Sequence, residues 1–190
     1  MNRPELFGKR EERTFFAHHI LLHAALLEIQ DAETGEKGRF NKCLAAMAMM
    51  SLAIEALANA VGSKVADDWD TFERLSPHDK VECLVSMLHI SLDKTQEPWT
   101  TLQFLFGFRN DIAHPKPESV VQEKVLPEPG LATTAIGRPL SVLERQITLG
   151  NAKRSYDAVN KLKSMLTDAL PVEHRFGIYA DMWSGSTSVA

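Results

Sequence analysis

Residues 104–115 of the chain, FLFGFRNDIAHP, join an apolar helix end to a cation, an amide and an imidazole. The apolar start predicts the buried end of a helix, and Pro115 predicts that this helix ends at or before His114. Asn110 and His114 are four residues apart and share a helix face, whereas Arg109 and His114 lie about 140° apart around an ideal helix. Because Pro115 disfavours helical geometry at His114, we expect the last turn to loosen and bring His114 toward Arg109.

Helical patterns extend outward from this stretch through nearly the whole chain. Apolar spacing, capping residues and Pro or Gly breakers predict helices over residues 12–32, 40–61, 77–89, 98–114, 141–147 and 148–170. Gly62 is expected as the C-cap of the second helix, and Ser76 and Pro77 as the start of the third. We therefore expect an all-α fold, an up-and-down bundle of four to five helices in which residues 1–171 form one domain. A long loop over residues 115–139 should separate the last two main helices, and residues 172–190 should form a loosely ordered tail.

Composition and cysteine usage indicate an ordinary globular chain. The 190 residues are 44% hydrophobic and carry a net charge of -4, so contact with nucleic acid would need a local basic patch. Cys43 and Cys83 form no C-x-x-C motif and are expected as buried thiols in a reducing compartment. The N-terminus is charged and does not resemble a secretory signal, so we expect a cytoplasmic protein. No phosphate-binding or dinucleotide-binding glycine motif is present, and no cofactor is expected.

Residues 44–61 are nearly uncharged and close to the length that spans a membrane. However, they contain Glu55 and Asn59, both costly in lipid, and are richer in Ala and Met than in Leu and Ile. We expect a central helix of a soluble bundle and no membrane association.

The segment from Arg109 to His114 resembles the HEPN family, the higher eukaryotes and prokaryotes nucleotide-binding domains. Members share an Arg, a polar residue directly after it, and a His a few residues later, near the end of a bundle helix. Arg109, Asn110 and His114 match this pattern. The resemblance extends to the helix that contains SLAIEALAN, residues 51–59, and to the Ala-rich last helix, and covers roughly residues 12–170. The long loop over residues 115–139 is not a general feature of the family.

This resemblance implies a homodimer in which two motifs face each other and form a metal-independent endoribonuclease site. His114 would take the proton of a ribose 2′-hydroxyl, because imidazole titrates near neutral pH, and Arg109 would bind the phosphate. Asn110 would orient the imidazole or bind phosphate, and Lys116 is the expected substrate-binding residue. The products would carry 2′,3′-cyclic phosphate ends. The biological setting implied is a toxin–antitoxin or phage-defence pair, with a cognate antitoxin or a nucleotidyltransferase as partner.

Glu55 is a carboxylate in the middle of an apolar helix, where a charge is costly unless it is paired. We expect it to position Arg109, with Asn59 one turn further along the same face. The alternative is that Glu55 and Asn59 pair with each other and with the backbone as polar contacts inside the bundle.

Other interpretations of these residues stay open. Arg109 and His114 are also suited to capping the carboxyl end of a helix, and the chain would then be a non-catalytic helical dimer acting as an interaction or nucleotide-binding module. His18, His19 and His23 have a spacing that can bind a metal, but no acidic or cysteine ligand is near, so packing is favoured and no metal site is expected.

Overall fold

Helix α2 (Arg39–Val65) lies at the centre of the fold. The structure is a computed structural model and describes residues 7–121, 138–179 and 182–189. The elements that contact α2 are α1 (Ala17–Thr34), α3 (Pro77–Met87), α4 (Trp99–Ala113), α6 (Leu149–Ala169) and the short 3-10 helix η1 (Trp69–Phe72). The mostly helical fold predicted from the sequence is thereby confirmed.

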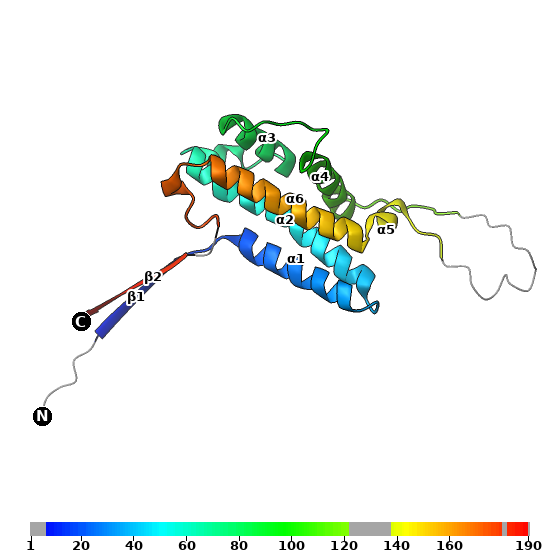
Figure 1. The fold of residues 1–190 in the computed structure, drawn as a ribbon, viewed down its shortest axis with the longest axis horizontal. Coiled ribbons are helices and arrows are strands. Elements are labelled where there is room, and N and C mark those ends of the chain that lie inside the picture. The colour runs from blue at the N-terminus through cyan, green and yellow to red at the C-terminus, as the bar shows by residue number, and fades with distance from the viewer. Residues whose placement is uncertain (1–6, 122–137, 180–181, 190) are drawn as a thin grey trace, which may run out of the picture.

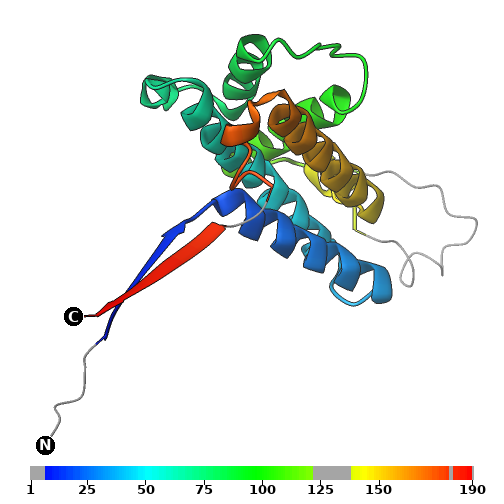
Figure 2. The ribbon, with the colours of Figure 1, turned by 60° about the vertical axis from the view of Figure 1, so that its left-hand side comes forward.

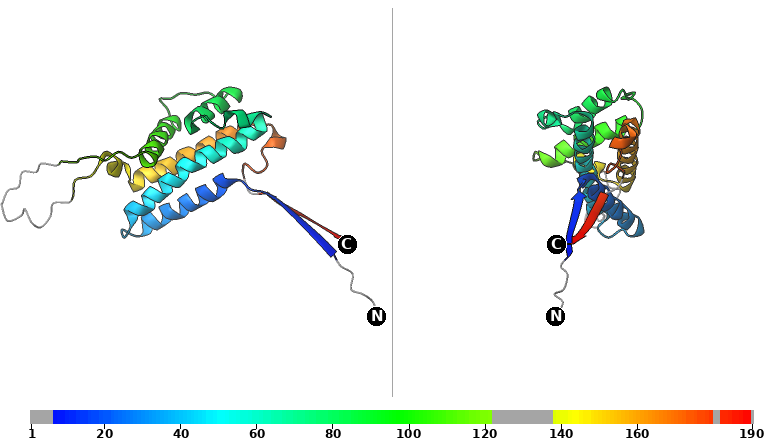
Figure 3. Two further views of the ribbon diagram at one scale, coloured as in Figure 1. Left: turned by 180° about the vertical axis from the view of Figure 1, so that it is seen from behind. Right: turned by 90° about the vertical axis from the view of Figure 1, so that its left-hand side faces the viewer.

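The helices form layers around α2 and α6, which run side by side (Figure 1). α1 covers one side of this pair, and the shorter α3 and α4 cover the other, as the views from behind and from the side also show (Figure 3). The core between them holds apolar side chains from all of these helices, among them Ala25, Met47, Met50, Ile54, Leu57, Leu84, Leu105, Phe108 and Leu162.

α2 passes the length and hydropathy test for a membrane span, with a mean hydropathy of 1.7 over 18 residues. Half of that window is buried inside the bundle. A core helix of a soluble protein passes the same test, so the absence of membrane association and the cytoplasmic location stay predictions.

Local capping explains where several helices begin. Ser76 accepts a hydrogen bond from the Asp79 backbone N–H at the start of α3, as predicted, and Pro77 occupies the first turn. Ser141 and Glu144 form a reciprocal capping box at the start of α5 (Val142–Gln146), and Thr148 caps α6. α5 therefore stands as a separate short helix next to the end of α4.

A two-stranded ribbon was not predicted. The first helix begins at Ala17 and not near residue 12, because residues Phe7–Thr14 form strand β1. It pairs antiparallel with β2 (Met182–Val189), in a register that places Phe7 opposite Val189 and Thr14 opposite Met182. The C-terminal segment, expected as a loosely ordered tail, thus contains the 3-10 helix η3 (Val172–His174) and a paired strand (Figure 2).

Gly62 does not end α2, as its residue type had suggested. The helix continues to Val65, and the indole of Trp69 packs against Gly62 so closely that a Cβ there would lie 2.1 Å from the ring. The glycine serves close packing, and the prediction of a C-cap at this position was wrong. The predicted loop over residues 115–139 is described only at its ends, since residues 122–137 lie outside the described ranges.

Candidate functional site

The predicted motif, Arg109 to His114, lies at the carboxyl end of α4. This helix ends at Ala113, two residues before Pro115. His114 is the C-cap residue, with φ -130° and ψ 51°, and its backbone N–H donates to the Asn110 carbonyl at 2.9 Å. The expected departure of His114 from helical geometry is confirmed. The His114 side chain is exposed and therefore accessible to a substrate.

Arg109 is half-buried, in contrast to the exposed Asn110 directly after it. Its Nη1 donates to Asn110 Oδ1 at 3.4 Å, a long contact that joins the cation and the amide. Among the described residues, no hydrogen bond or ion pair joins Arg109 to His114 within one chain. The expected convergence of these two side chains is therefore not observed in a single subunit.

An open groove lies between the end of α4 and α5, with a volume of about 500 Å³. It brings together His114 and Lys116, the expected base and the expected substrate-binding residue. The other lining residues are Asp111, Pro115, Glu118, Ser141, Val142 and Leu143. Arg109 and Asn110 are not among them. The groove can accept a solvent-exposed phosphate ester, and its ionisable side chains are one lysine, two carboxylates and a histidine.

α5 forms one wall of this groove, and its position depends on two hydrogen bonds to carboxylates. The Val142 N–H donates to Glu118 Oε2 at 3.3 Å across the groove, and the Ser141 N–H donates to Glu144 Oε2 at 2.8 Å. The Ser141 backbone N–H, together with the nearby Arg138, holds the pKa of the Glu144 carboxyl below its usual value.

Glu55 does not hold Arg109, so this prediction was wrong for the single chain. Its Oε1 lies 3.0 Å from the ammonium of Lys80 on α3. The Lys80 side chain is only 2% exposed, and a buried ammonium needs a carboxylate more than the half-buried Arg109 does. Nothing in the sequence distinguishes Lys80 from a surface lysine, since it follows the capping residues of an amphipathic helix.

Asn59 pairs neither with Glu55 nor with Arg109. Its Oδ1 accepts a hydrogen bond from the Trp69 indole N–H at 3.3 Å, which fixes η1 against the end of α2. Glu55 and Asn59 are thus polar contacts between elements of the bundle, each with its own side-chain partner, and they do not pair with each other as the alternative interpretation held.

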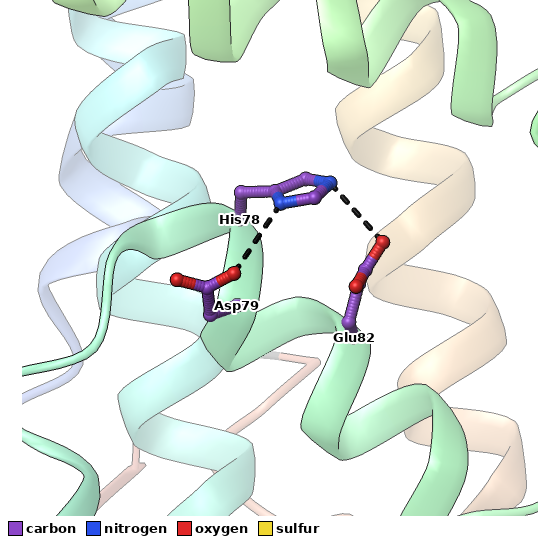
Figure 4. A group of neighbouring side chains, drawn as sticks. All are labelled: His78, Asp79 and Glu82. Atoms are coloured by element: carbon purple, nitrogen blue, oxygen red, sulfur yellow. Dashed lines mark ion pairs between the residues drawn. The ribbon is translucent and has the colours of Figure 1, made fainter.

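A second cluster of ionisable groups lies on α3, away from the groove. Each nitrogen of the His78 ring faces a different carboxylate, with Nδ1 3.6 Å from Asp79 Oδ1 and Nε2 3.2 Å from Glu82 Oε1 (Figure 4). Lys94 forms a further ion pair with Glu82. One ligand atom from each of these three residues lies within 4.8 Å of the others, a spacing that could hold a metal ion, but exposed acidic groups are common without one. The cluster is explained by ion pairs on the helix surface.

The N-terminal histidines serve packing. The side chains of His18 and His19 donate from Nε2 to the carbonyls of Ile178 and Gly177, at 3.1 Å and 2.7 Å. Both histidines therefore join α1 to the segment that precedes β2. Sequence spacing alone showed the cluster but not its partners, which lie about 160 residues away in the chain.

Comparison of the chain with protein-family models, with curated proteins and with solved structures finds no match. Any function for the groove must therefore be argued from the residues that form it.

Proposed function

We propose that the chain is a HEPN-like, metal-independent endoribonuclease in which His114 acts on RNA bound in the groove between α4 and α5. The observation that carries this proposal is the exposed His114, released from the helix by Pro115 and placed beside Lys116 in an open groove. Cleavage of a phosphate ester needs a proton acceptor and a cation within reach. His114 supplies the proton acceptor and Lys116 the cation.

The chemistry follows from transfer of one proton at each end of the scissile bond. The imidazole of His114 takes the proton of a ribose 2′-hydroxyl, and the 2′-oxygen forms a bond to the adjacent phosphorus. The bond from phosphorus to the 5′-oxygen breaks, and that oxygen receives a proton from a second acid. The products are a 2′,3′-cyclic phosphate and a 5′-hydroxyl. Lys116 and Arg109 stabilise the negative charge on the phosphate oxygens.

Two parts of this mechanism need a second subunit: the acid that protonates the 5′-oxygen, and an arginine placed beside His114. Within one chain, Arg109 contacts Asn110 and does not line the groove that holds His114. A homodimer that brings two α4 ends together would place Arg109 of one subunit beside His114 of the partner subunit. This arrangement supplies both a general base and a general acid, and a cognate antitoxin or a nucleotidyltransferase would act by covering this surface.

The test is incubation of purified protein with varied RNAs, with and without a chelator, beside His114→Ala and the matched control His23→Ala. His23 is an exposed histidine on the outer face of α1, far along the chain from the motif. We expect cleavage that survives chelation, is lost by more than about a hundredfold in His114→Ala, and persists in His23→Ala. Equal cleavage by both variants, or none by the wild-type chain, contradicts the proposal.

A second candidate is a non-catalytic interaction or nucleotide-binding module. Asp111 and Glu118 favour it, because their carboxylates line the same groove as Lys116 and oppose the approach of a phosphate. A module of this kind would bind a partner through the groove without cleaving RNA. His114→Ala would then change partner affinity and leave every RNA intact.

A further inference from the structure

Two carboxylates line the groove between α4 and α5, although a phosphate in this groove would be repelled by them. Asp111 and Glu118 share the groove with the cation Lys116. Among the described residues, neither carboxylate forms an ion pair, with Lys116 or with any other cation. A polyanion alone does not complement this set of charges, but a ligand that carries hydrogen-bond donors as well as a phosphate does.

A bound metal ion does not explain these two carboxylates. Among the described residues, only the α3 cluster of His78, Asp79 and Glu82 brings three potential ligand atoms within 4.8 Å of one another. The ionisable residues of the groove have no such spacing. The partners that remain for Asp111 and Glu118 are donor groups of a molecule that occupies the groove.

Of the two carboxylates, Glu118 is the one held in position. Its Oε2 accepts a hydrogen bond from the Val142 backbone N–H at 3.3 Å, which ties the segment after α4 to the start of α5. Its Oε1 has no hydrogen-bond partner among the described residues, and the side chain is exposed. Since an ionised carboxylate has about four acceptor positions, both oxygens can still accept a hydrogen bond from a ligand.

An apolar surface lies beside this carboxylate. The Val142 side chain lines the groove and is 52% exposed, and Pro115 and Leu143 line the groove as well. Proteins that recognise single-stranded RNA contact a base on its face and form hydrogen bonds to its edge. Val142 serves both contacts, because its side chain can cover a base face while its N–H fixes the carboxylate of Glu118 beside it.

Guanine is the base whose edge suits a carboxylate. Its Watson–Crick edge presents N1–H and the N2 amino group side by side, so a carboxylate can accept two parallel hydrogen bonds from it. Adenine, cytosine and uracil each have one donor group on this edge, with an acceptor next to it that repels a carboxylate. A bidentate pair of this kind favours the correct base over the others by about tenfold or more.

We infer that Glu118 selects guanine at the cleavage site, by accepting hydrogen bonds from N1–H and the N2 amino group of a guanine whose neighbouring phosphate lies beside His114 and Lys116. This inference rests on the proposed RNA site and adds a base specificity to it. Glu118 determines specificity and takes no part in the proton transfers. Asp111 is the less suited carboxylate, since no hydrogen bond holds its side chain among the described residues.

Binding of short thymidine oligonucleotides tests the selection without cleavage, because they lack the 2′-hydroxyl. Each fluorescent probe contains one central guanine or one central hypoxanthine, the base that lacks only the N2 amino group. In fluorescence anisotropy, we expect the wild-type chain to bind the guanine probe about fivefold or more tightly than the hypoxanthine probe. Glu118→Gln should bind the two probes equally, although its amide oxygen can still accept from the Val142 N–H. The matched control Glu73→Gln, at an exposed glutamate that does not line the groove, should keep the preference.

A carboxylate that only repels phosphate would give a different result. Glu118→Gln would then bind both probes more tightly, and the wild-type chain would not distinguish guanine from hypoxanthine. Either this result, or a wild-type chain that binds neither probe, overturns the inference. Circular dichroism checks that the variants keep their helices.

Cleavage of RNA separates this inference from the proposed function. Cleavage at equal rates next to all four bases would overturn the role of Glu118 and leave the ribonuclease proposal standing. Selective binding of the guanine probe by a chain that cleaves no RNA would support the role of Glu118 and contradict the ribonuclease proposal. If both proposals hold, the cuts lie next to guanine, and Glu118→Gln cuts next to all four bases.

Discussion

His114 shows how one neighbouring residue prepares a side chain for chemistry. Its backbone N–H still completes the last helical turn, but Pro115 forces its φ and ψ out of the helical region. The imidazole consequently leaves the regular helix surface and enters the groove that α5 completes. The departure of His114 from helical geometry depends on a local steric rule, which is why the sequence was sufficient to predict it. The groove with α5 was not predicted, and the expected approach of His114 to Arg109 is not observed.

Pro115→Ala tests the effect of the proline on the backbone geometry of His114 while the imidazole itself is kept. Without the proline, α4 can continue past His114, which rotates the imidazole away from the groove. We expect RNA cleavage to fall by about tenfold or more, with folding stability unchanged or slightly higher. Pro117→Ala, two residues later, is the matched control and should retain cleavage. If both variants cleave RNA at the wild-type rate, the geometry at His114 is not what activates it.

Lys80 and Glu55 form the most buried ion pair between described helices, and the cost of breaking it should be measurable. Glu55→Ala leaves the ammonium of Lys80 buried without a partner. Since the Glu55 side chain is 31% exposed, we expect a loss of about 2–3 kcal/mol in the free energy of unfolding, less than for a fully buried pair. Lys80→Met removes the charge itself and should cost less.

Urea denaturation of these variants beside Arg109→Ala also tests whether Glu55 interacts with Arg109. Arg109→Ala should change the free energy of unfolding by less than about 1 kcal/mol, because the side-chain hydrogen bond of Arg109 among the described residues is the long one to Asn110. A loss as large as that of Glu55→Ala, and one that is not additive with it, would mean that Glu55 and Arg109 are coupled.

At the scale of elements, the capping box that starts α5 contains a carboxylate, so the stability of this helix should depend on pH. The pKa of Glu144 is lowered in the folded chain, chiefly by the Ser141 backbone N–H. Its stabilising contribution is therefore present above the pKa of the unfolded chain and is lost as the pH falls through the lower, folded value. As the pH falls below the ordinary pKa of a glutamate and through the lower pKa of the folded chain, the capping box should open and α5 should loosen.

Hydrogen exchange at the Ser141 and Glu144 amides measures this directly. Their protection should fall as the solution is acidified in the wild-type chain, and Glu144→Gln, which can still cap but does not titrate, should lack this dependence. Glu173→Gln, at an exposed glutamate of η3, is the matched control and should behave as the wild type. Equal acid sensitivity in all three chains would show that another group controls α5.

The helices themselves were predictable because their signals are local. Ser76 and Pro77 start α3, Thr148 starts α6, and Pro115 ends α4, each through the chemistry of a few adjacent residues. Gly62 was misread because its role depends on Trp69, seven residues later, whose indole leaves no room for a Cβ. A glycine near the end of an apolar run looks the same in both situations.

At the scale of the whole molecule, the contacts that the sequence did not predict join segments far apart in the chain. Glu55 and Lys80 meet because α2 and α3 pack together, and only their burial shows that they need each other. The ribbon joins the two ends of the chain, where β2 is a short polar run of Ser, Gly and Thr with weak apolar alternation. Pairs of residues or strands that are far apart in the chain can be identified only from the folded structure.

The proposed function depends on whether RNA is cleaved by attack of its own 2′-oxygen on the adjacent phosphorus, with the 5′-oxygen as the leaving group. The most direct measurement is mass spectrometry of the RNA ends that the purified chain produces in the presence of a chelator, with His114→Ala as the control. We expect 2′,3′-cyclic phosphate and 5′-hydroxyl ends that are absent from the His114→Ala reaction. Ends that carry 3′-hydroxyl and 5′-phosphate groups, or cyclic phosphate ends in equal amount from the His114→Ala variant, would contradict it.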